Sequence, residues 1–426
     1  MSLPFLDITD NWYDIRDLSN ISREILEAVE DLAGNEVAYI IAPLIGFVAS
    51  FLLFVLPTQL YLGVLGERKI IGRMQSRFGP NRVGKFGVLQ PIADAIKLMQ
   101  KEALTPASSD RVVMYLAPIF FVAPVILLFA VIPFGENMVV ADVSASLIFF
   151  LAVSSFPSII MFMAGWSHNN KYSLFGAMRI VAMAISYEIP LVLTLLGMVV
   201  WTGTLSLNGI VFWQAEADIW LAILAPMAFI TYFICISSEL NRTPTDIAEA
   251  ESEIVAGYLT EYSGMKWGLF YGMDIGYALA AAAFAATVFL GGWSVFGLED
   301  TLPGWAMFIG KTYAVYFLFI WTRGTLPRLR IDQLMAFAWK FMLPVALFSL
   351  VVFTTEKMLW VETLTSEGET PSDAWLWLFA AVNLALTVAI VVFWSRFLGY
   401  RPESTPTKPR LVRDARGYVP LTEVER

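Results

Sequence analysis

The hydrophobic positions of this chain occur in long blocks separated by polar connections. A helix of about 20 apolar residues spans the roughly 30 Å core of a bilayer, and runs of this length recur from residue 37 to residue 394. Five runs lack charge and four hold one ionisable residue each. Together they predict about nine transmembrane helices, at 37–65, 112–133, 143–166, 180–201, 219–238, 267–293, 305–321, 334–355 and 374–394. The pattern therefore predicts an all-α, polytopic integral membrane protein.

Two shorter stretches have one apolar and one polar face. In the N-terminal segment 1–36, apolar residues at 21–32 recur at helical spacing among acidic ones, which predicts an amphipathic helix on the membrane surface or against a neighbour. Residues 92–99 follow a proline and also have one apolar face. Their helix is expected to lie in the membrane interface.

Composition excludes a soluble enzyme with its own redox cofactor. The 426 residues are 58% hydrophobic and 15% charged, with a mean hydropathy of +0.66, which is too apolar for an ordinary soluble domain. One cysteine, Cys235, and one histidine, His168, exclude a four-thiolate iron–sulfur site and a two-histidine haem on this chain alone. The chain has no glycine-rich nucleotide-binding loop. We expect no metal and no bound redox cofactor here.

Positive charge predicts the orientation. Lys and Arg gather in alternate connections, whereas the intervening connections are acidic. The basic connections are 62–111, 167–179, 239–266 and 322–333. By the positive-inside rule these face the cytoplasm and the N-terminus lies outside. The expected organisation is an eight-helix membrane core at 37–359, a ninth helix at 374–398 and a polar cytoplasmic tail at 399–426, extended or disordered. The net charge of −9 resides mainly on the outer side.

Ionisable residues inside spans are candidates for function, because each costs about 2.5 to 3.5 kcal/mol on insertion scales. Glu188 lies beside Pro190, which leaves a backbone carbonyl free. Asp274 is about two turns into its span, and Lys311 is near a span end, where it is expected to reach toward the surface. A proton relay and structural ion pairs are both open interpretations.

The connection 239–266 is rich in acids. Thr243 is expected to cap a helix that begins at Pro244, with three carboxylates on one face and Glu251 nearly opposite. The three carboxylates belong to Asp246, Glu249 and Glu253. Stacked carboxylates favour proton exchange, although a solvated acidic face is the alternative. The basic connection 62–111 either anchors topology or receives a partner or an amphiphilic substrate.

Long motifs in order resemble one family. They are Glu-Arg-Lys-x-x-Gly-x-x-Gln-x-Arg-x-Gly-Pro-Asn-Arg-Val-Gly at 67–84, Leu-Gln-Pro-x-Ala-Asp-x-x-Lys-Leu at 89–98, Lys-Tyr-Ser-Leu at 171–174, Ser-Tyr-Glu-Ile-Pro at 186–190, Glu-x-Asn-Arg-x-Pro at 239–244, Glu-Ala-Glu-Ser-Glu-x-Val-Ala-Gly-Tyr at 249–258, Glu-Tyr-Ser-Gly at 261–264 and Leu-Pro-Arg-x-Arg-x-Asp-Gln-Leu-Met at 326–335. Over about 60–344 the chain resembles the H subunits of proton-pumping NADH:quinone oxidoreductase, respiratory complex I.

The resemblance implies a role in a quinone chamber beneath the peripheral arm, coupled to proton translocation in the cell inner membrane. By motif match, the implied quinone-site residues are Glu67, Arg68, Asp94, Lys97, Arg242, Asp246, Glu249, Glu251 and Glu253. The implied proton relay is Glu188, Glu239 and Asp274. It implies no catalytic residue on this chain, ubiquinone or menaquinone as substrate, and NADH, FMN and iron–sulfur clusters on partner subunits. The implied partners are the quinone-site subunits of the peripheral arm and neighbouring membrane-arm subunits.

Three positions depart from the family pattern. Asp274 stands where Glu is usual, Met183 where Gln is usual and Thr245 where Phe is usual. His168 occupies a usually small position and is expected at the surface. One alternative function is the homologous subunit of an energy-converting hydrogenase or of a dehydrogenase without an NADH module. An independent ion transporter is another.

Overall fold

The computed structural model describes residues 59–136, 138–247, 254–295, 302–364, 373–397, 411–414 and 417–420. The N-terminal segment, most of the first predicted span and most of the tail lie outside these ranges. In chain order the described elements are η3 Gln59–Gly66, α4 Glu67–Met74, η4 Lys85–Gly87, α5 Gln90–Gln100, α6 Arg111–Ala130, α7 Ser146–Ser154, α8 Phe156–Ser167, α9 Lys171–Thr202, α10 Leu207–Glu216, α11 Leu221–Leu224, α12 Pro226–Glu239, η5 Gly257–Leu259, α14 Gly264–Phe289, α15 Gly304–Thr325, α16 Ile331–Phe337, η6 Ala338–Met342, α17 Leu343–Leu364, α18 Asp373–Phe397, β1 Leu411–Asp414 and β2 Gly417–Pro420.

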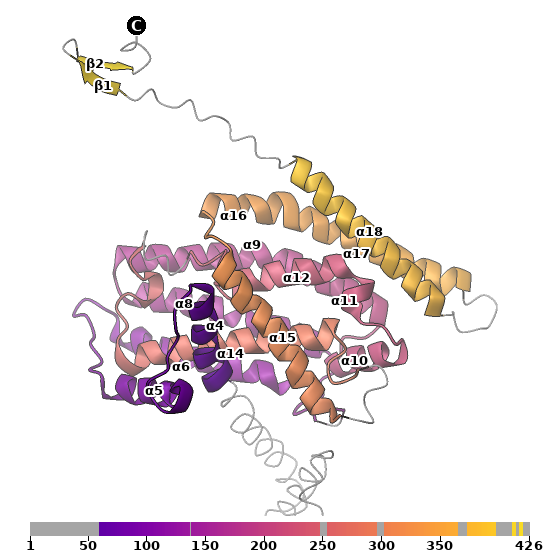
Figure 1. Cartoon of the computed structure of the whole chain (residues 1–426), viewed down its shortest axis with the longest axis horizontal. Helices are drawn as coiled ribbons and strands as arrows, with labels where there is room; N and C mark the ends of the chain where they lie inside the picture. The colour runs from indigo at the N-terminus through magenta and orange to yellow at the C-terminus, as the bar shows by residue number, and fades with distance from the viewer. Residues whose placement is uncertain are drawn as a thin grey trace, which may run out of the picture.

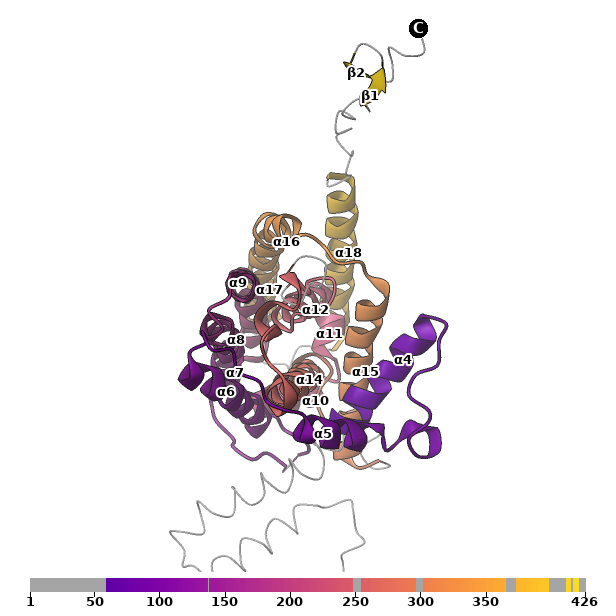
Figure 2. The ribbon, with the colours of Figure 1, turned by 90° about the vertical axis from the view of Figure 1, so that its left-hand side faces the viewer.

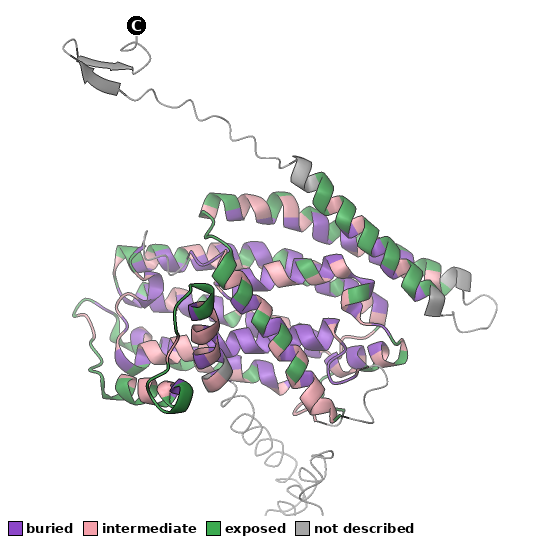
Figure 3. Ribbon diagram, viewed as in Figure 1, coloured by how far each residue is buried: buried purple, intermediate pink, exposed green. Residues whose placement is uncertain are grey.

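The helices form a bundle around α12 and α14 (Figures 1 and 2). Six helical stretches in the described ranges are long and apolar enough to cross a membrane: Arg111–Ala130, Ser146–Ser167, Lys171–Thr202, Gly264–Phe289, Ile331–Val361 and Trp375–Phe393. In α14, 83% of the most apolar stretch is buried, against 22% in α18 (Figure 3). These helices confirm the all-α, polytopic membrane fold. The strands β1 and β2 pair with each other in the tail.

Local sequence explains where long helices begin and end. The Asp110 carboxylate accepts the backbone N–H of Val112 at 3.1 Å and so caps α6. Asn170 does the same for α9 through Tyr172 N–H, also at 3.1 Å. Helix α9 stops at Gly203, whose φ of 72° suits a residue without a side chain. These ends position the two faces of the bundle, with α5 at one end and α10 at the other (Figure 1).

Two predicted spans are interrupted by proline. The span predicted at 143–166 consists of α7 and α8, which meet at Ser155 just before Pro157. The span predicted at 219–238 consists of α11 and α12, separated by Ala225 with φ −129° and ψ 64° before Pro226. Proline has no N–H to donate, so nearby carbonyls lose their helical partner. Inside a membrane such carbonyls must find other donors.

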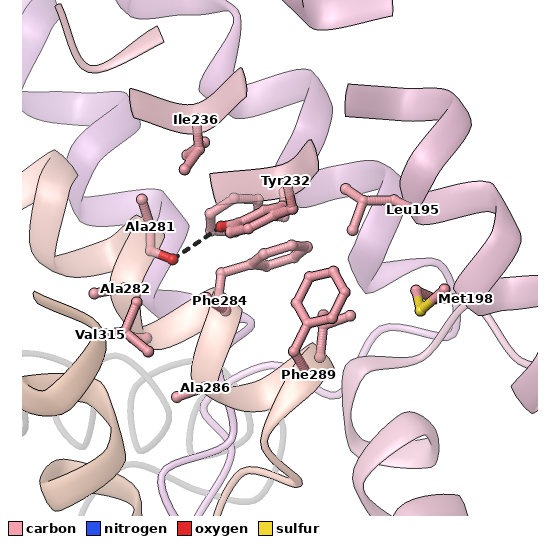
Figure 4. Close-up of a cluster of buried hydrophobic side chains, with 14 of the residues drawn as sticks. Leu195, Met198, Tyr232, Ile236, Ala281, Ala282, Phe284, Ala286, Phe289 and Val315 are labelled. Atoms are coloured by element: carbon pink, nitrogen blue, oxygen red, sulfur yellow. Dashed lines mark hydrogen bonds between the residues drawn. The ribbon is translucent and has the colours of Figure 1, made fainter. Parts of the chain in front are cut away.

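The middle of the bundle is packed through small residues and aromatic rings. Alanines along α14 allow α12 to approach, and Tyr232 on α12 stacks on Phe284 with ring centroids 5.9 Å apart (Figure 4). The Tyr232 hydroxyl donates to the Ala281 carbonyl at 2.9 Å (Figure 4). Buried aromatic pairs of this kind add about 0.5 to 1.5 kcal/mol beyond area burial. The interface that carries these residues is therefore rigid.

Lys311 does not reach toward the surface as expected. Its ammonium group donates to three backbone carbonyls that follow or end α14, those of Leu290 at 2.6 Å, Gly292 at 2.9 Å and Ser294 at 2.5 Å. Carbonyls at a helix C-terminus lack intrahelical donors and carry partial negative charge. The end of α14 therefore holds the lysine inside the fold, and the snorkelling prediction is wrong.

Candidate functional site

Glu67 is the centre of a buried ion cluster at the basic end of the bundle. It begins α4, and its carboxylate meets Arg242 at 3.4 Å and Arg323 from α15. The Tyr316 hydroxyl donates to the same carboxylate at 3.3 Å. Burial by itself raises the pKa of Glu67, but the two arginines more than offset it, so its pKa lies below the ordinary value of 4.5. Glu67 is therefore ionised.

Arg242 links this cluster to Asp274. Its side chain is only 3% exposed, and its Nη2 lies 3.9 Å from a carboxylate oxygen of Asp274, beyond hydrogen-bond range. The guanidinium also sits over the Tyr316 ring, 5.6 Å from the centroid. Its Nε and Nη2 have no hydrogen-bond partner within the described ranges. The site thus has donors available for an oxygen acceptor.

Asp246 pairs with a different arginine. Arg328 donates to one of its carboxylate oxygens at 2.7 Å, and the other oxygen has no partner among the described residues. The helix predicted from Pro244 is wrong for residues 244–247, which form turns. The reason is the neighbouring α15–α16 connection: the Thr243 hydroxyl donates to the Arg323 carbonyl at 3.1 Å instead of capping a helix. The acids at 249, 251 and 253 lie outside the described residues: Glu249, Glu251 and Glu253.

Asp94 on α5 forms a separate and more exposed cluster. Arg68 donates to it at 2.6 Å, Lys97 at 3.3 Å and Gln90 at 3.1 Å. Partial burial raises the pKa of Asp94, but the bond from Arg68 and the others lower it below its ordinary value. The quinone-site residues predicted in the first basic connection therefore divide between two clusters. Only Glu67 reaches the buried one.

The surface beside Asp94 is both apolar and basic. Helix α5 forms as predicted, and its apolar residues Ile92, Ile96 and Met99 are exposed. Phe78 is 87% exposed in the preceding connection. An exposed apolar face next to positive charge is typical of a helix at a membrane surface. This arrangement fits the interfacial placement expected for α5.

A second group of acids lies where α9, α12 and α14 approach the break between α7 and α8. Tyr277 on α14 donates to a carboxylate oxygen of Glu239 at 2.6 Å. Ser155, at the break, donates to Glu188 at 2.6 Å. Glu188 is also close enough to repel Glu239 electrostatically. The predicted relay acids Glu188 and Glu239 therefore belong to one neighbourhood.

Four residues of these clusters are absent from the sequence prediction: Ser155, Tyr277, Tyr316 and Arg323. Tyr277 follows Asp274 by three positions, so the two share one face of α14. That spacing is a signal that could have been used. Ser155 and Tyr316 carry no comparable signal, because only the fold brings them to the acids. Arg323 stands in a basic connection, where the sequence reveals only its charge.

His168 is buried, which corrects the expectation of a surface position. It is 1% exposed, and its Nδ1 lies 2.7 Å from the Ser173 hydroxyl. The ring meets that of Tyr262 edge to face at 4.7 Å. Burial lowers the pKa of His168 to about 4, although Glu261 acts in the opposite direction. The imidazole is therefore neutral near pH 7 and fills the turn between α8 and α9.

Comparison with known proteins completes the description of the site. The NADH dehydrogenase family model matches residues 45–354. The H subunit of NADH-quinone oxidoreductase from Dehalococcoides mccartyi (strain CBDB1) is 48% identical over 331 residues, covering 78% of this chain and 89% of that protein. The proteins of the same name from Geobacillus sp. (strain WCH70) and Bacillus cytotoxicus are 46% and 45% identical, covering 71% and 73% of this chain and 90% and 93% of theirs. The resemblance found in the motifs is confirmed, and the chain belongs to the NADH dehydrogenase family.

Proposed function

We propose that this chain is the membrane subunit of a proton-pumping NADH:quinone oxidoreductase that forms part of the quinone chamber and couples quinone reduction to proton translocation. The observation that carries the proposal is the buried cluster of Glu67, Arg242 and Asp274, which connects the basic end of the bundle to acids inside it. Its relatives are subunits named for this activity.

The quinone part of the proposal rests on donors and an apolar approach. A quinone has carbonyl oxygens that accept hydrogen bonds and an apolar tail. Arg242 has buried N–H groups without a partner among the described residues, and leaving such groups unpaired costs about 1 to 3 kcal/mol each. An oxygen acceptor in the site would satisfy them. The exposed apolar face of α5 offers a path from the membrane surface.

The proton part rests on carboxylates carried by adjacent helices. Asp274 is on α14, Glu239 ends α12 and Glu188 is within α9. Buried carboxylates near one another repel, so protonation of one favours ionisation of the next. Arg242, within 3.9 Å of Asp274, ties the first acid to the proposed quinone site. A change of charge at the quinone can thus alter proton occupancy further along.

The same proposal assigns sides of the membrane and partners. The bundle end that holds Lys171, Arg242 and Arg328 faces the cytoplasm, and the end with Glu136 and Glu216 faces outward. The chain resides in the cell inner membrane with its N-terminus outside and its C-terminus inside. Peripheral-arm subunits dock on the basic end and carry FMN and iron–sulfur clusters. Ubiquinone or menaquinone is the substrate.

Photo-crosslinking tests the quinone site directly. An azido-quinone added to the purified complex is expected to label residues 67–101 of this chain, and excess unmodified quinone should block the labelling. Labelling confined to other subunits would contradict a quinone site that includes this chain.

The choice between NADH and another donor needs a different measurement. The proposal predicts that the purified complex contains FMN and reduces quinone with NADH in an inhibitor-sensitive way. A flavin-free, nickel-containing complex would favour the hydrogenase alternative. Ion transport by this chain alone in liposomes would favour an independent transporter.

A further inference from the structure

Two hydroxyl groups at the α7–α8 break each face two acceptors. The Tyr277 hydroxyl lies 2.6 Å from a carboxylate oxygen of Glu239 and 3.1 Å from the Ser154 carbonyl. The Ser155 hydroxyl lies 2.6 Å from a carboxylate oxygen of Glu188 and 3.1 Å from the Leu151 carbonyl. In both cases one acceptor is an acid of the proposed relay and the other is a backbone carbonyl of α7.

A hydroxyl has one proton, so it can fully satisfy only one of these acceptors at a time. The carbonyls are available because α7 ends at Ser154, and the last carbonyls of a helix lack intrahelical donors. Pro157, at the start of α8, cannot supply an N–H to them. The break therefore creates a second acceptor beside each acid, within a membrane where water cannot serve.

We propose that Tyr277 and Ser155 are positioning residues that switch acceptor with the protonation state of Glu239 and Glu188. When a carboxylate is ionised, its hydroxyl partner donates to it. When a proton arrives, it forms an O–H bond on the carboxyl group, which donates to the hydroxyl oxygen. The hydroxyl then turns its own proton to the α7 carbonyl. On release the carboxyl O–H bond breaks and the hydroxyl turns back, so no other bond changes.

The arrangement gives each acid a hydrogen-bonded partner in both charge states. A buried carboxyl that changes charge otherwise loses a partner in one state, at a cost of about 1 to 3 kcal/mol. Both alternative acceptors belong to the last turn of α7, from Leu151 to Ser154. Protonation of Glu239 and of Glu188 is therefore felt by the same turn of helix. This inference rests on the proposed function, because it concerns how the relay acids exchange protons.

Two other buried hydroxyls provide matched controls. Tyr232 lies in the same α12–α14 interface, and its hydroxyl donates to the Ala281 carbonyl at 2.9 Å (Figure 4). Ser349 on α17 donates to the Ala346 carbonyl at 2.8 Å. Neither hydroxyl has a hydrogen bond to a carboxylate among the described contacts. Removing either takes away one buried hydroxyl without touching an acid.

The test compares four variants of the whole complex in proteoliposomes: Tyr277→Phe, Ser155→Ala, Tyr232→Phe and Ser349→Ala. Proton translocation and NADH:quinone turnover are measured together, and NADH oxidation by an artificial acceptor reports assembly. We expect at least about a tenfold loss of turnover for Tyr277→Phe and a several-fold loss for Ser155→Ala, in the range for removal of a proton-transfer partner. The two controls should change turnover less than about twofold.

A spectroscopic readout separates this role from a structural one. In redox-induced infrared difference spectra, the protonated-carboxyl band that Glu239→Gln removes should shift in Tyr277→Phe and stay in place in Tyr232→Phe. An unshifted band, or Ser155→Ala behaving like Ser349→Ala, would overturn the switch. Normal pumping by Glu239→Gln would instead overturn the proposed relay itself. If Tyr277→Phe does not assemble, Ser155→Ala and the corresponding Glu188 band decide the question.

Discussion

At Glu67, burial and charge act in opposite directions on one carboxyl group. Burial disfavours the ionised form, but Arg242 and Arg323 hold it ionised. Removing the charge in Glu67→Gln would leave Arg242 buried without its counter-ion, which costs about 3 to 5 kcal/mol. We expect a lower melting temperature and a lower yield of assembled complex. Asp94→Asn, in the exposed cluster, should cost about 1 kcal/mol or less. Equal effects would contradict the central role of Glu67.

The same pair predicts a pH dependence. Because the pKa of Glu67 is lowered in the fold, its contribution to stability is complete above the ordinary value of 4.5 and is lost as pH falls through the folded value. Wild-type stability should therefore drop in that acidic range. The drop should be smaller in Glu67→Gln, and melting curves between pH 6 and pH 3 measure it.

His168 predicts pH dependence in a higher range. Its pKa is lowered from 6.5 to about 4 by burial, so the unfolded chain binds a proton that the folded chain refuses between these values. Stability is complete above pH 6.5 and falls by up to about 3 kcal/mol as pH decreases to 4. His168→Asn can still meet Ser173 and does not titrate. The variant should lose less melting temperature than wild type between pH 7.5 and pH 5, and an equal loss would exclude His168.

Sequence reasoning at this scale identified acids better than their partners. Glu67, Arg242 and Glu188 carry charge in apolar surroundings or in long motifs, and that signal is local. The partner Tyr277 is an ordinary aromatic residue in the sequence, and only the packing of α14 against α12 reveals its contact with Glu239. Thr243 shows the reverse error, since its expected cap lost to a tertiary acceptor, the Arg323 carbonyl.

Among the elements, the ninth helix is held by a single amide. Asn383 on α18 donates to the Leu224 carbonyl at 2.9 Å and to the Glu356 carboxylate of α17 at 2.9 Å. The Leu224 carbonyl is available because α11 ends there. The family match ends at residue 354, before Glu356 and Asn383. This junction therefore lies outside the region shared with the family.

Removing that amide should loosen α18. Asn383→Leu keeps the size of the side chain but leaves the Leu224 carbonyl and the Glu356 carboxyl without their donor, at a cost of about 1 to 3 kcal/mol for each buried group left unpaired. We expect a lower melting temperature of the purified complex. Leu384→Ala changes an exposed neighbour on the same helix and serves as control. No difference between the two variants would show that the amide does not secure α18.

Hydropathy predicted the long elements because burial in lipid demands a continuous apolar helix. It could not predict the breaks at Ser155 and Ala225, since their free carbonyls are satisfied only by distant side chains such as Tyr277 and Asn383. A proline in a run was visible, but not whether the helix bends, continues or ends. Helix α9 continues through Pro190, whereas α7 ends before Pro157.

The whole molecule places its charged clusters at different depths. The exposed Asp94 cluster lies on α5, the buried Glu67 cluster lies behind it, and Glu188 and Glu239 lie at the α7–α8 break. Helices α17 and α18 expose apolar side chains along much of their length (Figure 3). Such faces suit lipid or other membrane subunits. The order of clusters runs from the basic end of the bundle toward its interior, as coupling between a quinone and a proton path requires.

Proton translocation by Glu188→Gln tests the central claim most directly. Glu188 is half-buried and held by Ser155, so the neutral variant keeps the shape of the site while removing its exchangeable proton. The account predicts assembled complex with normal NADH oxidation by an artificial acceptor, but with proton translocation and quinone reduction reduced together. Full proton translocation at the wild-type ratio of protons to NADH in the assembled variant would contradict it.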